Sequence, residues 1–232
     1  SVLSHFHLDC PQIEITVKSD IPIASGLGSG AAVSAAVGKA IVQALGKSMP
    51  QEELNALVFE VEKIHHGTPS GIDNTVIVYE RPVYFVKGQQ IEFLNIKTPF
   101  HIVVADTGKT ALTHEAVGDV RKLYEANANA IQSIFSEIEN IVQQAIQCMD
   151  TGDIQGLGRL MNKNHEYLQQ LTVSSHELDN LVGAARQAGA LGAKLSGGGR
   201  GGNMIALAEE STVTQIKSAL KQAGAVRVFD SI

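Results

Sequence analysis

The sequence predicts an α+β protein, and three observations support this prediction. Residues 12–18 alternate apolar and polar side chains, which is the pattern of a half-buried strand. Most of the stretch 113–188 has apolar residues at helical spacing instead. From residue 192 the pattern changes to strand, glycine loop, strand, helix and strand, an order typical of an α+β sandwich.

The first half of the chain is expected to contain two helices and several short strands. A buried helix of small residues follows a glycine loop and ends at Gly46. An amphipathic helix begins near Pro50 and stops before Gly67. Short strands are then predicted over three segments, at 74–79, 82–87 and 91–95.

The second half is expected to be mostly helical, with strands at its two ends. The composition changes slightly near Thr98-Pro99, so we place a domain boundary there and predict two domains, 1–98 and 99–232. One long helix is predicted over 113–149. The remaining predicted elements are helices at 153–171, 175–188 and 211–223 and strands at 101–105, 192–195, 203–207 and 225–229.

Composition excludes several classes of function. A net charge of −6, a pI near 5.7 and the absence of Trp argue against a nucleic-acid surface. No apolar run reaches the length of a membrane span, and the first residues lack the features of a signal peptide. The two cysteines, Cys10 and Cys148, lack partner spacing and suit a reducing compartment, so we expect a cytoplasmic protein. Neither a monomer nor a homodimer is excluded.

The run Gly26-Leu27-Gly28-Ser29-Gly30-Ala31 lies between a predicted strand and the first buried helix. Glycines allow the backbone to approach a ligand closely, and free N–H groups at a helix start bind anions such as the phosphates of ATP. The Gly-Lys-Ser/Thr of a Walker loop is absent. Tight packing of the helix against a sheet is the alternative explanation.

A second candidate region runs from Glu62 to Asp73. Glu62 falls near the end of a helix, where the helix dipole disfavours a carboxylate, so a compensating cation is expected. Asp73 follows a glycine-bounded loop and is predicted to precede a strand. Phosphoryl transfer needs one carboxylate to accept a hydroxyl proton and another to hold Mg²⁺. A plain turn residue is the alternative for Asp73.

Two further loops are candidates for binding. Residues 197–202 contain five glycines in six positions, which favours close approach to a ligand or to another loop. Arg200, the exception, would either pair with phosphate or lie in solvent at the loop tip. Thr113 follows Asp106-Thr107-Gly108 at a helix start, where its hydroxyl would cap the helix, serve a substrate anion, or both.

Together, these loops resemble those of the GHMP kinases in content and order. The most specific parts are His66-Gly67-Thr68-Pro69-Ser70-Gly71-Ile72-Asp73 and the run from Asp106-Thr107-Gly108 to Thr113. The resemblance covers roughly 12–232. It implies a two-lobed fold, with an incomplete α/β lobe followed by a ferredoxin-like lobe. In detail it is most similar to the branch of the family that phosphorylates mevalonate.

The resemblance also implies roles for individual residues. Asp73 would be the catalytic base, Glu62 and Ser29 would hold Mg²⁺, and the run 26–31 would bind the phosphates of ATP. The residues implied in substrate contact are Thr113, His66, Ser70, Gly197, Gly198 and Gly199. The implied reaction transfers the γ-phosphoryl group of ATP to the 5-hydroxyl of mevalonate.

Two departures from the family pattern stand out. The family loop usually reads Gly-Leu-Gly-Ser-Ser-Ala, and Gly30 takes the place of the second serine. The family's opening motif, with a catalytic lysine, does not occur, so we expect a strand-rich segment before Ser1 and an inactive chain in its absence. A sister kinase for phosphomevalonate, homoserine or a sugar, and a non-catalytic ligand sensor on the same fold, remain alternatives.

Overall fold

The computed structural model describes residues 2–6, 13–19, 28–66, 69–110 and 113–230, except for the side chains of His65 and His66. Its internal contacts divide the chain into two compact units, residues 1–94 and 95–232. The boundary predicted from composition lies four residues further along the chain. None of the described helices is long and apolar enough to cross a lipid bilayer.

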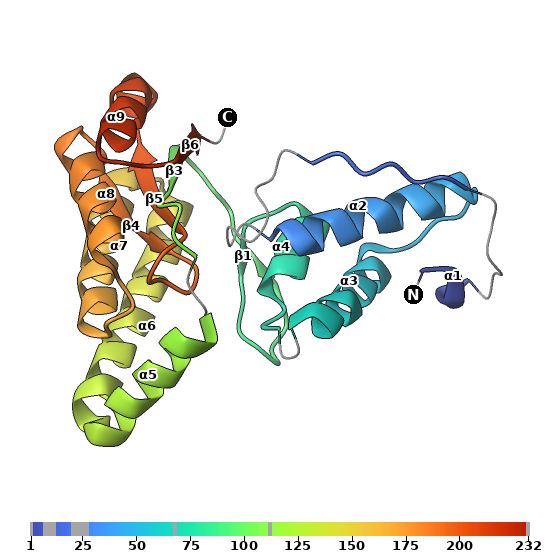
Figure 1. The fold of residues 1–232 in the computed structure, drawn as a ribbon, viewed down its shortest axis with the longest axis horizontal. Coiled ribbons are helices and arrows are strands. Elements are labelled where there is room, and N and C mark those ends of the chain that lie inside the picture. The colour runs from blue at the N-terminus through green and yellow to red at the C-terminus, as the bar shows by residue number, and fades with distance from the viewer. Residues whose placement is uncertain (1, 7–12, 20–27, 67–68, 111–112, 231–232) are drawn as a thin grey trace. The chain divides into compact units, whose positions relative to one another are not determined.

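The first unit is built on three helices that pack side by side (Figure 1). These are α2 (Ser29–Ala44), α3 (Gln51–His66) and α4 (Ile72–Tyr79); a short helix, α1 (Val2–His5), precedes them. A small hairpin follows, in which β1 (Val83–Tyr84) pairs antiparallel with β2 (Glu92–Phe93). The core shared by the three helices consists of Ala31, Ala35, Leu54, Val58 and Val78.

The second unit is a four-stranded antiparallel sheet with helices packed against it. The strands are β3 (His101–Asp106), β4 (Gly192–Ser196), β5 (Asn203–Ala208) and β6 (Arg227–Asp230), in the order β4-β5-β3-β6. This is the strand order of a ferredoxin-like fold, as the family resemblance implies. Helices α8 (His176–Gln187) and α9 (Glu210–Gln222) bury one face of the sheet around Leu178, Leu181, Ile216 and Leu220.

The remaining helices of this unit are α5 (Thr113–Ala126), α6 (Ala128–Thr151) and α7 (Ile154–Gln170). Leu157 and Met161 of α7 pack with Leu207 of β5, alongside side chains from α6. Helix α7 also runs beside the edge strand β4. Asn162 Oδ1 accepts the backbone N–H of Ala193, and His165 Nδ1 accepts that of Leu195, so the helix protects an edge that no strand covers.

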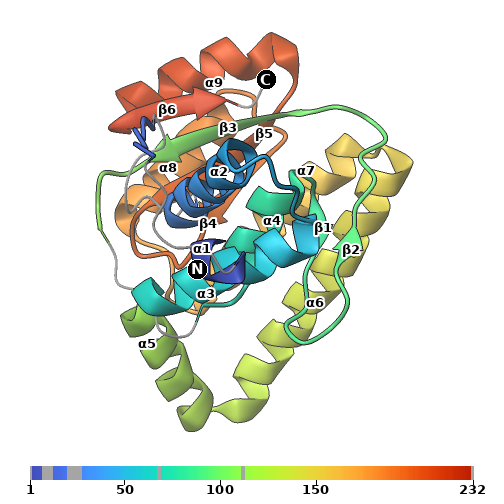
Figure 2. The same cartoon turned by 90° about the vertical axis from the view of Figure 1, so that its right-hand side faces the viewer.

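Three predicted elements differ from the structure. Residues 13–19 form no regular structure, because no described strand lies beside them to pair with. The predicted strand at 74–79 is helix α4: packing of Val78 between α2 and α3 overrides the strand preference of its β-branched residues. The predicted single helix 113–149 is two, because Asn127 ends α5 and its side chain accepts the N–H of Ala130 to begin α6 (Figure 2).

Candidate functional site

Helix α2 begins at a glycine that adopts a left-handed conformation. Gly28 is the N-cap residue, with φ 66° and ψ 26°, and no side chain caps the helix there. A side chain at this φ would be strained, so the turn requires glycine. The N–H groups of Ser29, Gly30 and Ala31 have no side-chain cap, and a helix start of this kind is suited to binding an anion. Gly26 and Leu27 lie outside the described residues.

Asp73 lies beside this helix start. A Cβ atom placed on Gly28 would stand 3.7 Å from Cβ of Asp73 and 3.9 Å from its carboxyl carbon. The residue lies in the first turn of α4, where a carboxylate interacts favourably with the helix dipole, and it is exposed. The prediction that Asp73 precedes a strand is therefore wrong, because it lies within α4, whereas the structure does bring its carboxylate close to Gly28 at the start of α2.

Buried polar contacts hold Asp73 in place, and the sequence reasoning missed them. The adjacent Asn74 is buried and donates to Asn55 Oδ1 of α3 at 2.7 Å. Thr75 is also buried and donates to the carbonyl of Gly71 at 2.7 Å, within a turn where Gly71 has φ 96°. The presence of an Asn and a Thr directly after a candidate catalytic Asp could have indicated such supporting hydrogen bonds in the sequence.

Glu62 is the second carboxylate at the start of α2. It is 5% exposed, and a Cβ atom placed on Gly30 would stand 2.9 Å from its Oε1 atom. Glycine at position 30 therefore leaves room for this buried carboxylate, which gives a physical reason for the departure from the family loop. The positive end of α2 compensates the charge of Glu62, which the C-terminal part of its own helix disfavours.

Glu62, together with the hydroxyl of Ser29 next to Gly30, fits a magnesium ion. Among the described residues, no three His, Cys, Asp or Glu side chains gather into a metal-ligand cluster. Mg²⁺ does not require such a cluster, because it usually keeps several waters and binds one or two carboxylates together with substrate phosphates. Glu62 beside the start of α2 supplies one such carboxylate, and Ser29 adds a hydroxyl in the same turn.

Two predicted substrate contacts in this unit receive less support. Ser70 Oγ accepts the backbone N–H of Ile72 at 3.3 Å, so it helps to form the turn before α4. His66 is the last residue of α3, and its side chain lies outside the described part of the structure. Their predicted roles stay predictions.

In the second unit, the glycine loop packs against its own chain. A Cβ atom on Gly198 would stand 2.7 Å from Oγ1 of Thr113, the first residue of α5. One on Gly199 would stand 1.9 Å from the carbonyl oxygen of Val173. Gly197 differs, because no atom lies within 4 Å of its Cβ position. Thr113 and the loop are thus neighbours, and Gly197 is open to a ligand.

The loop after β3 is joined to this glycine loop. The carbonyl of Gly202 accepts the backbone N–H of Thr107 and, at 2.9 Å, its hydroxyl, while Gly202 N–H donates to the carbonyl of Lys109 at 2.8 Å. Asp106 accepts the N–H of Gly108 at 2.8 Å and so shapes the turn. Two motifs that the sequence separates by about 90 residues therefore form one structural unit.

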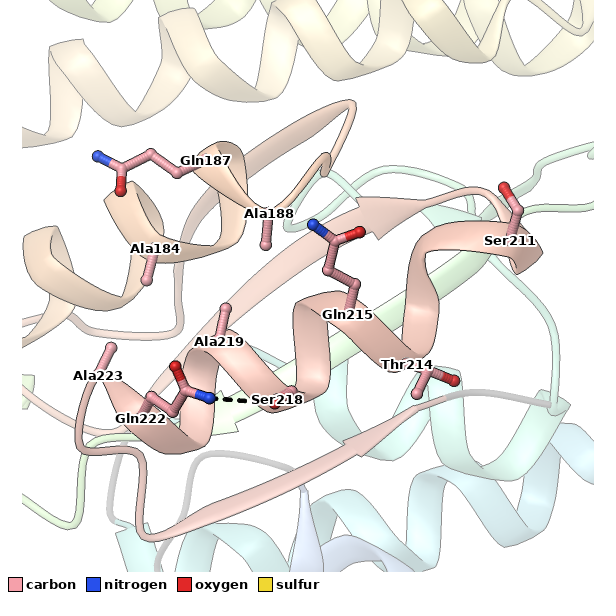
Figure 3. Close-up of a pocket in the computed structure, with 10 residues that line it drawn as sticks. All are labelled: Ala184, Gln187, Ala188, Ser211, Thr214, Gln215, Ser218, Ala219, Gln222 and Ala223. Atoms are coloured by element: carbon pink, nitrogen blue, oxygen red, sulfur yellow. Dashed lines mark hydrogen bonds between the residues drawn. The ribbon is translucent and has the colours of Figure 1, made fainter.

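One hollow in this unit contains none of the predicted residues. It lies between α8 and α9, and Figure 3 shows Gln187, Gln215 and Gln222 around alanines. The side chains that line it are amides, hydroxyls and methyl groups, so they offer no charge to a phosphate. We therefore assign it no part in phosphate binding.

Comparisons with known proteins identify the family. The family model for the N-terminal domain of GHMP kinases matches residues 1–81, and that for the GHMP kinase C-terminal domain matches residues 145–226. The chain belongs to the GHMP kinase family, and the predicted family and fold are confirmed.

Within the family, the chain is similar to mevalonate kinases. It is 37% identical to mevalonate kinase of Thermococcus sibiricus and 38% identical to that of Pyrococcus horikoshii, over 95% of this chain in both cases. It spans 67% and 66% of those proteins. The crystal structure of L. major mevalonate kinase in complex with R-mevalonate matches 99% of this chain and 73% of that one, with a TM-score of 0.86 and 32% identity.

Proposed function

We propose that this chain carries most of an ATP-dependent kinase that phosphorylates the 5-hydroxyl of mevalonate. The observation that supports it best is the position of the Asp73 carboxyl carbon, 3.9 Å from the Cβ position of Gly28 at the start of α2. A phosphate-binding turn and a proton acceptor thus lie together. The relatives named above are mevalonate kinases, which favours mevalonate as the acceptor.

The proposed chemistry assigns a separate task to each group. The N–H groups at the start of α2 bind the phosphate oxygens of ATP, and Asp73 accepts the proton of the attacking hydroxyl. Glu62 and Ser29 would hold Mg²⁺, which neutralises charge on the phosphates when bound. In the second unit we assign Thr113 and the backbone of residues 197–199 to contacts with the substrate. Positioning and charge stabilisation then provide most of the rate enhancement.

The test is phosphate transfer by the full-length protein that contains this chain. Mevalonate, phosphomevalonate, homoserine and galactose are offered with ATP and Mg²⁺, and we expect mevalonate to have the highest kcat/KM. If mevalonate were the poorest acceptor, the substrate assignment would be wrong and a sister kinase would replace it. Absence of transfer to every acceptor, with ATP still bound, would favour a ligand sensor.

Asp73→Asn tests the catalytic base. General-base catalysis contributes about 100-fold or more, so kcat should fall by at least that factor while ATP affinity changes little. Glu80→Gln is a matched control, because Glu80 is an exposed carboxylate at the other end of α4 and pairs with Lys39. Wild-type turnover in Asp73→Asn would remove Asp73 from the mechanism.

A further inference from the structure

Two residues in the second unit have unusual backbone conformations and contact each other. In the described part of the chain, three non-glycine residues have a left-handed φ: Glu80, Thr172 and Arg200. Arg200 has φ 59° and Thr172 has φ 57°. A β-branched residue such as Thr is a marked outlier there. Such strain persists only where the surroundings enforce it, and it concentrates at functional sites.

The side chain of Arg200 is held at all three of its nitrogens. Nη1 donates to Asp119 Oδ2 at 2.6 Å, Nε donates to the carbonyl of Thr172 at 3.2 Å, and Nη2 donates to the Thr172 hydroxyl at 3.5 Å. Asp119 lies on α5, and its other oxygen accepts from Lys122 at 2.8 Å. Hydrogen bonds from Lys122 and Arg200 lower the pKa of Asp119 to about 2, so its carboxylate stays ionised well below neutral pH.

Two further contacts join the glycine loop to the rest of the second unit. The backbone N–H of Arg200 donates to the carbonyl of Val173 at 2.7 Å. Gly198 packs against Thr113 at the first residue of α5, and Arg200 holds α5 again at Asp119, six residues along. Helix α5 is thus attached to the loop at its start and at its second turn.

Helix α5 has few fully buried side chains. Of its residues, Ala116 is buried, whereas Val117 and Tyr124 are among the exposed large hydrophobic side chains. Burial of apolar surface is the usual source of helix stability in proteins. Tyr124, near the end of α5, stacks on Phe135 of α6, whereas the first two turns of α5 contact the glycine loop at Thr113 and Asp119.

We propose that Arg200 is a positioning residue for phosphoryl transfer: its pairing with Asp119 clamps the glycine loop to α5 and so fixes Thr113 against Gly198. The inference rests on the proposed function in one respect, the assignment of Thr113 and residues 197–199 to the substrate. It differs from both roles that the sequence offers for Arg200, a phosphate ligand and a solvated loop tip. Three of the five guanidinium N–H groups donate to protein oxygens.

The experiment breaks the clamp from each side in the full-length protein. Arg200→Asn keeps a residue that tolerates the left-handed conformation but removes the guanidinium. Asp119→Asn removes the partner and leaves Arg200 in place. We expect each to lower kcat about tenfold with KM changed less than about threefold, because misplacement of a contact group mainly affects the transition state. The double variant should be no slower than either single variant, since both remove one interaction.

Two further variants separate this role from others. Lys122→Gln removes the other cation on Asp119 without touching the loop, and it should keep wild-type kcat. The charge-swapped pair Arg200→Asp with Asp119→Arg should recover part of the lost kcat.

Unchanged kcat in Asp119→Asn together with a large loss in Arg200→Asn would overturn the clamp and make Arg200 a direct phosphate ligand. Unchanged kcat in both, with a lower Tm, would reduce the pair to a stability contact.

A readout without catalysis keeps the clamp testable if the proposed function fails. Hydrogen–deuterium exchange of residues 197–202 should be faster in Arg200→Asn and Asp119→Asn than in the wild type and in Lys122→Gln. Equal exchange in all four proteins would contradict the clamp. Absence of phosphate transfer by the wild type would instead count against the proposed function.

Discussion

The two units each contain a glycine-rich turn, and different groups surround the glycines. At the start of α2, the Cβ positions of Gly28 and Gly30 face the carboxyl groups of Asp73 and Glu62. In the loop 197–202, the Cβ positions of Gly199 and Gly201 face the backbone carbonyls of Val173 and Lys109. The first turn leaves room for acidic side chains and their ligand, whereas the second leaves room mainly for the protein's own backbone.

This difference shows that glycine-rich turns with similar sequences can pack against chemically different groups. Substituting a glycine in a turn that faces carboxylates should mainly change the affinity for metal and phosphate. Substituting a glycine in a turn that faces carbonyl oxygens should mainly lower the stability of the fold, since an added methyl group must displace backbone atoms. The following substitutions separate these two kinds of sensitivity.

The largest effect is expected at Gly199. An alanine there would bring Cβ to 1.9 Å from the carbonyl oxygen of Val173 at a φ of 77°. We expect Gly199→Ala to lower the free energy of unfolding by about 2–4 kcal/mol, from backbone strain and displacement of the turn after α7. Urea unfolding followed by circular dichroism measures the loss.

Gly197→Ala is the matched control in the same loop. Gly197 has φ 83° but no atom within 4 Å of its Cβ position, so strain alone should cost about 1–2 kcal/mol. Equal losses in the two variants would show that close packing against Val173 does not distinguish them.

A smaller effect, on metal binding, is expected at Gly30. Gly30→Ala places a methyl group 2.9 Å from Oε1 of Glu62 and should shift that carboxylate. The Mg²⁺ concentration for half-maximal turnover of the full-length protein should rise about tenfold, as is typical when a ligand's supporting contacts change.

Gly38→Ala is the control for this substitution. Gly38 lies in the same helix, and its Cβ position is 2.9 Å from Cδ1 of Leu54, the end of an apolar side chain. Ala is a better helix former than Gly at both positions, so the variants differ mainly in whether the added methyl group meets Glu62 or Leu54. The same Mg²⁺ requirement in both variants would contradict a metal role for Glu62.

The smallest effect is a pH dependence of the strand that leads into the second loop. His165 accepts the N–H of Leu195 through Nδ1, and its Nε2 lies 3.0 Å from Asp179 Oδ1. Burial lowers the pKa of His165, an effect that Asp179 partly opposes and that Lys194 and Arg186 reinforce. Below about pH 6.5 the unfolded chain therefore binds a proton that the buried ring does not.

His165 should therefore not reduce the free energy of unfolding above pH 6.5. As the pH falls below 6.5, the free energy of unfolding should decrease, with a slope no steeper than about 1.4 kcal/mol per pH unit for one proton. Urea unfolding at pH 7.5 and pH 5.5 measures the change. His165→Asn, which keeps an acceptor for Leu195 N–H, should reduce the pH dependence. His176→Asn, at an exposed position at the start of α8, should not. An equal reduction in both variants would contradict the role of His165.

The sequence predicted the second unit better than the first. Helices α7, α8 and α9 and the strands of the sheet match their predicted positions within a few residues, because each has a clear apolar period or a local cap such as Ser175 at α8. The run Val76-Ile77-Val78 was mistaken for a strand because β-branched residues favour strands. In the structure, packing against α2 and α3 overrides this strand propensity. The break at Asn127 was missed because the apolar pattern continues across it.

The sequence by itself determined where the glycine turns and candidate carboxylates occur, because the left-handed turns at Gly28 and Gly71 and the cap at Ser175 depend on adjacent residues. Only the tertiary structure decided which of these groups meet. Asp73 reaches Gly28, and Arg200 pairs with Asp119 across 81 positions, through the packing of helices that no local pattern encodes. Contacts between distant residues depend on the burial of whole elements, so they appear only when the chain has folded.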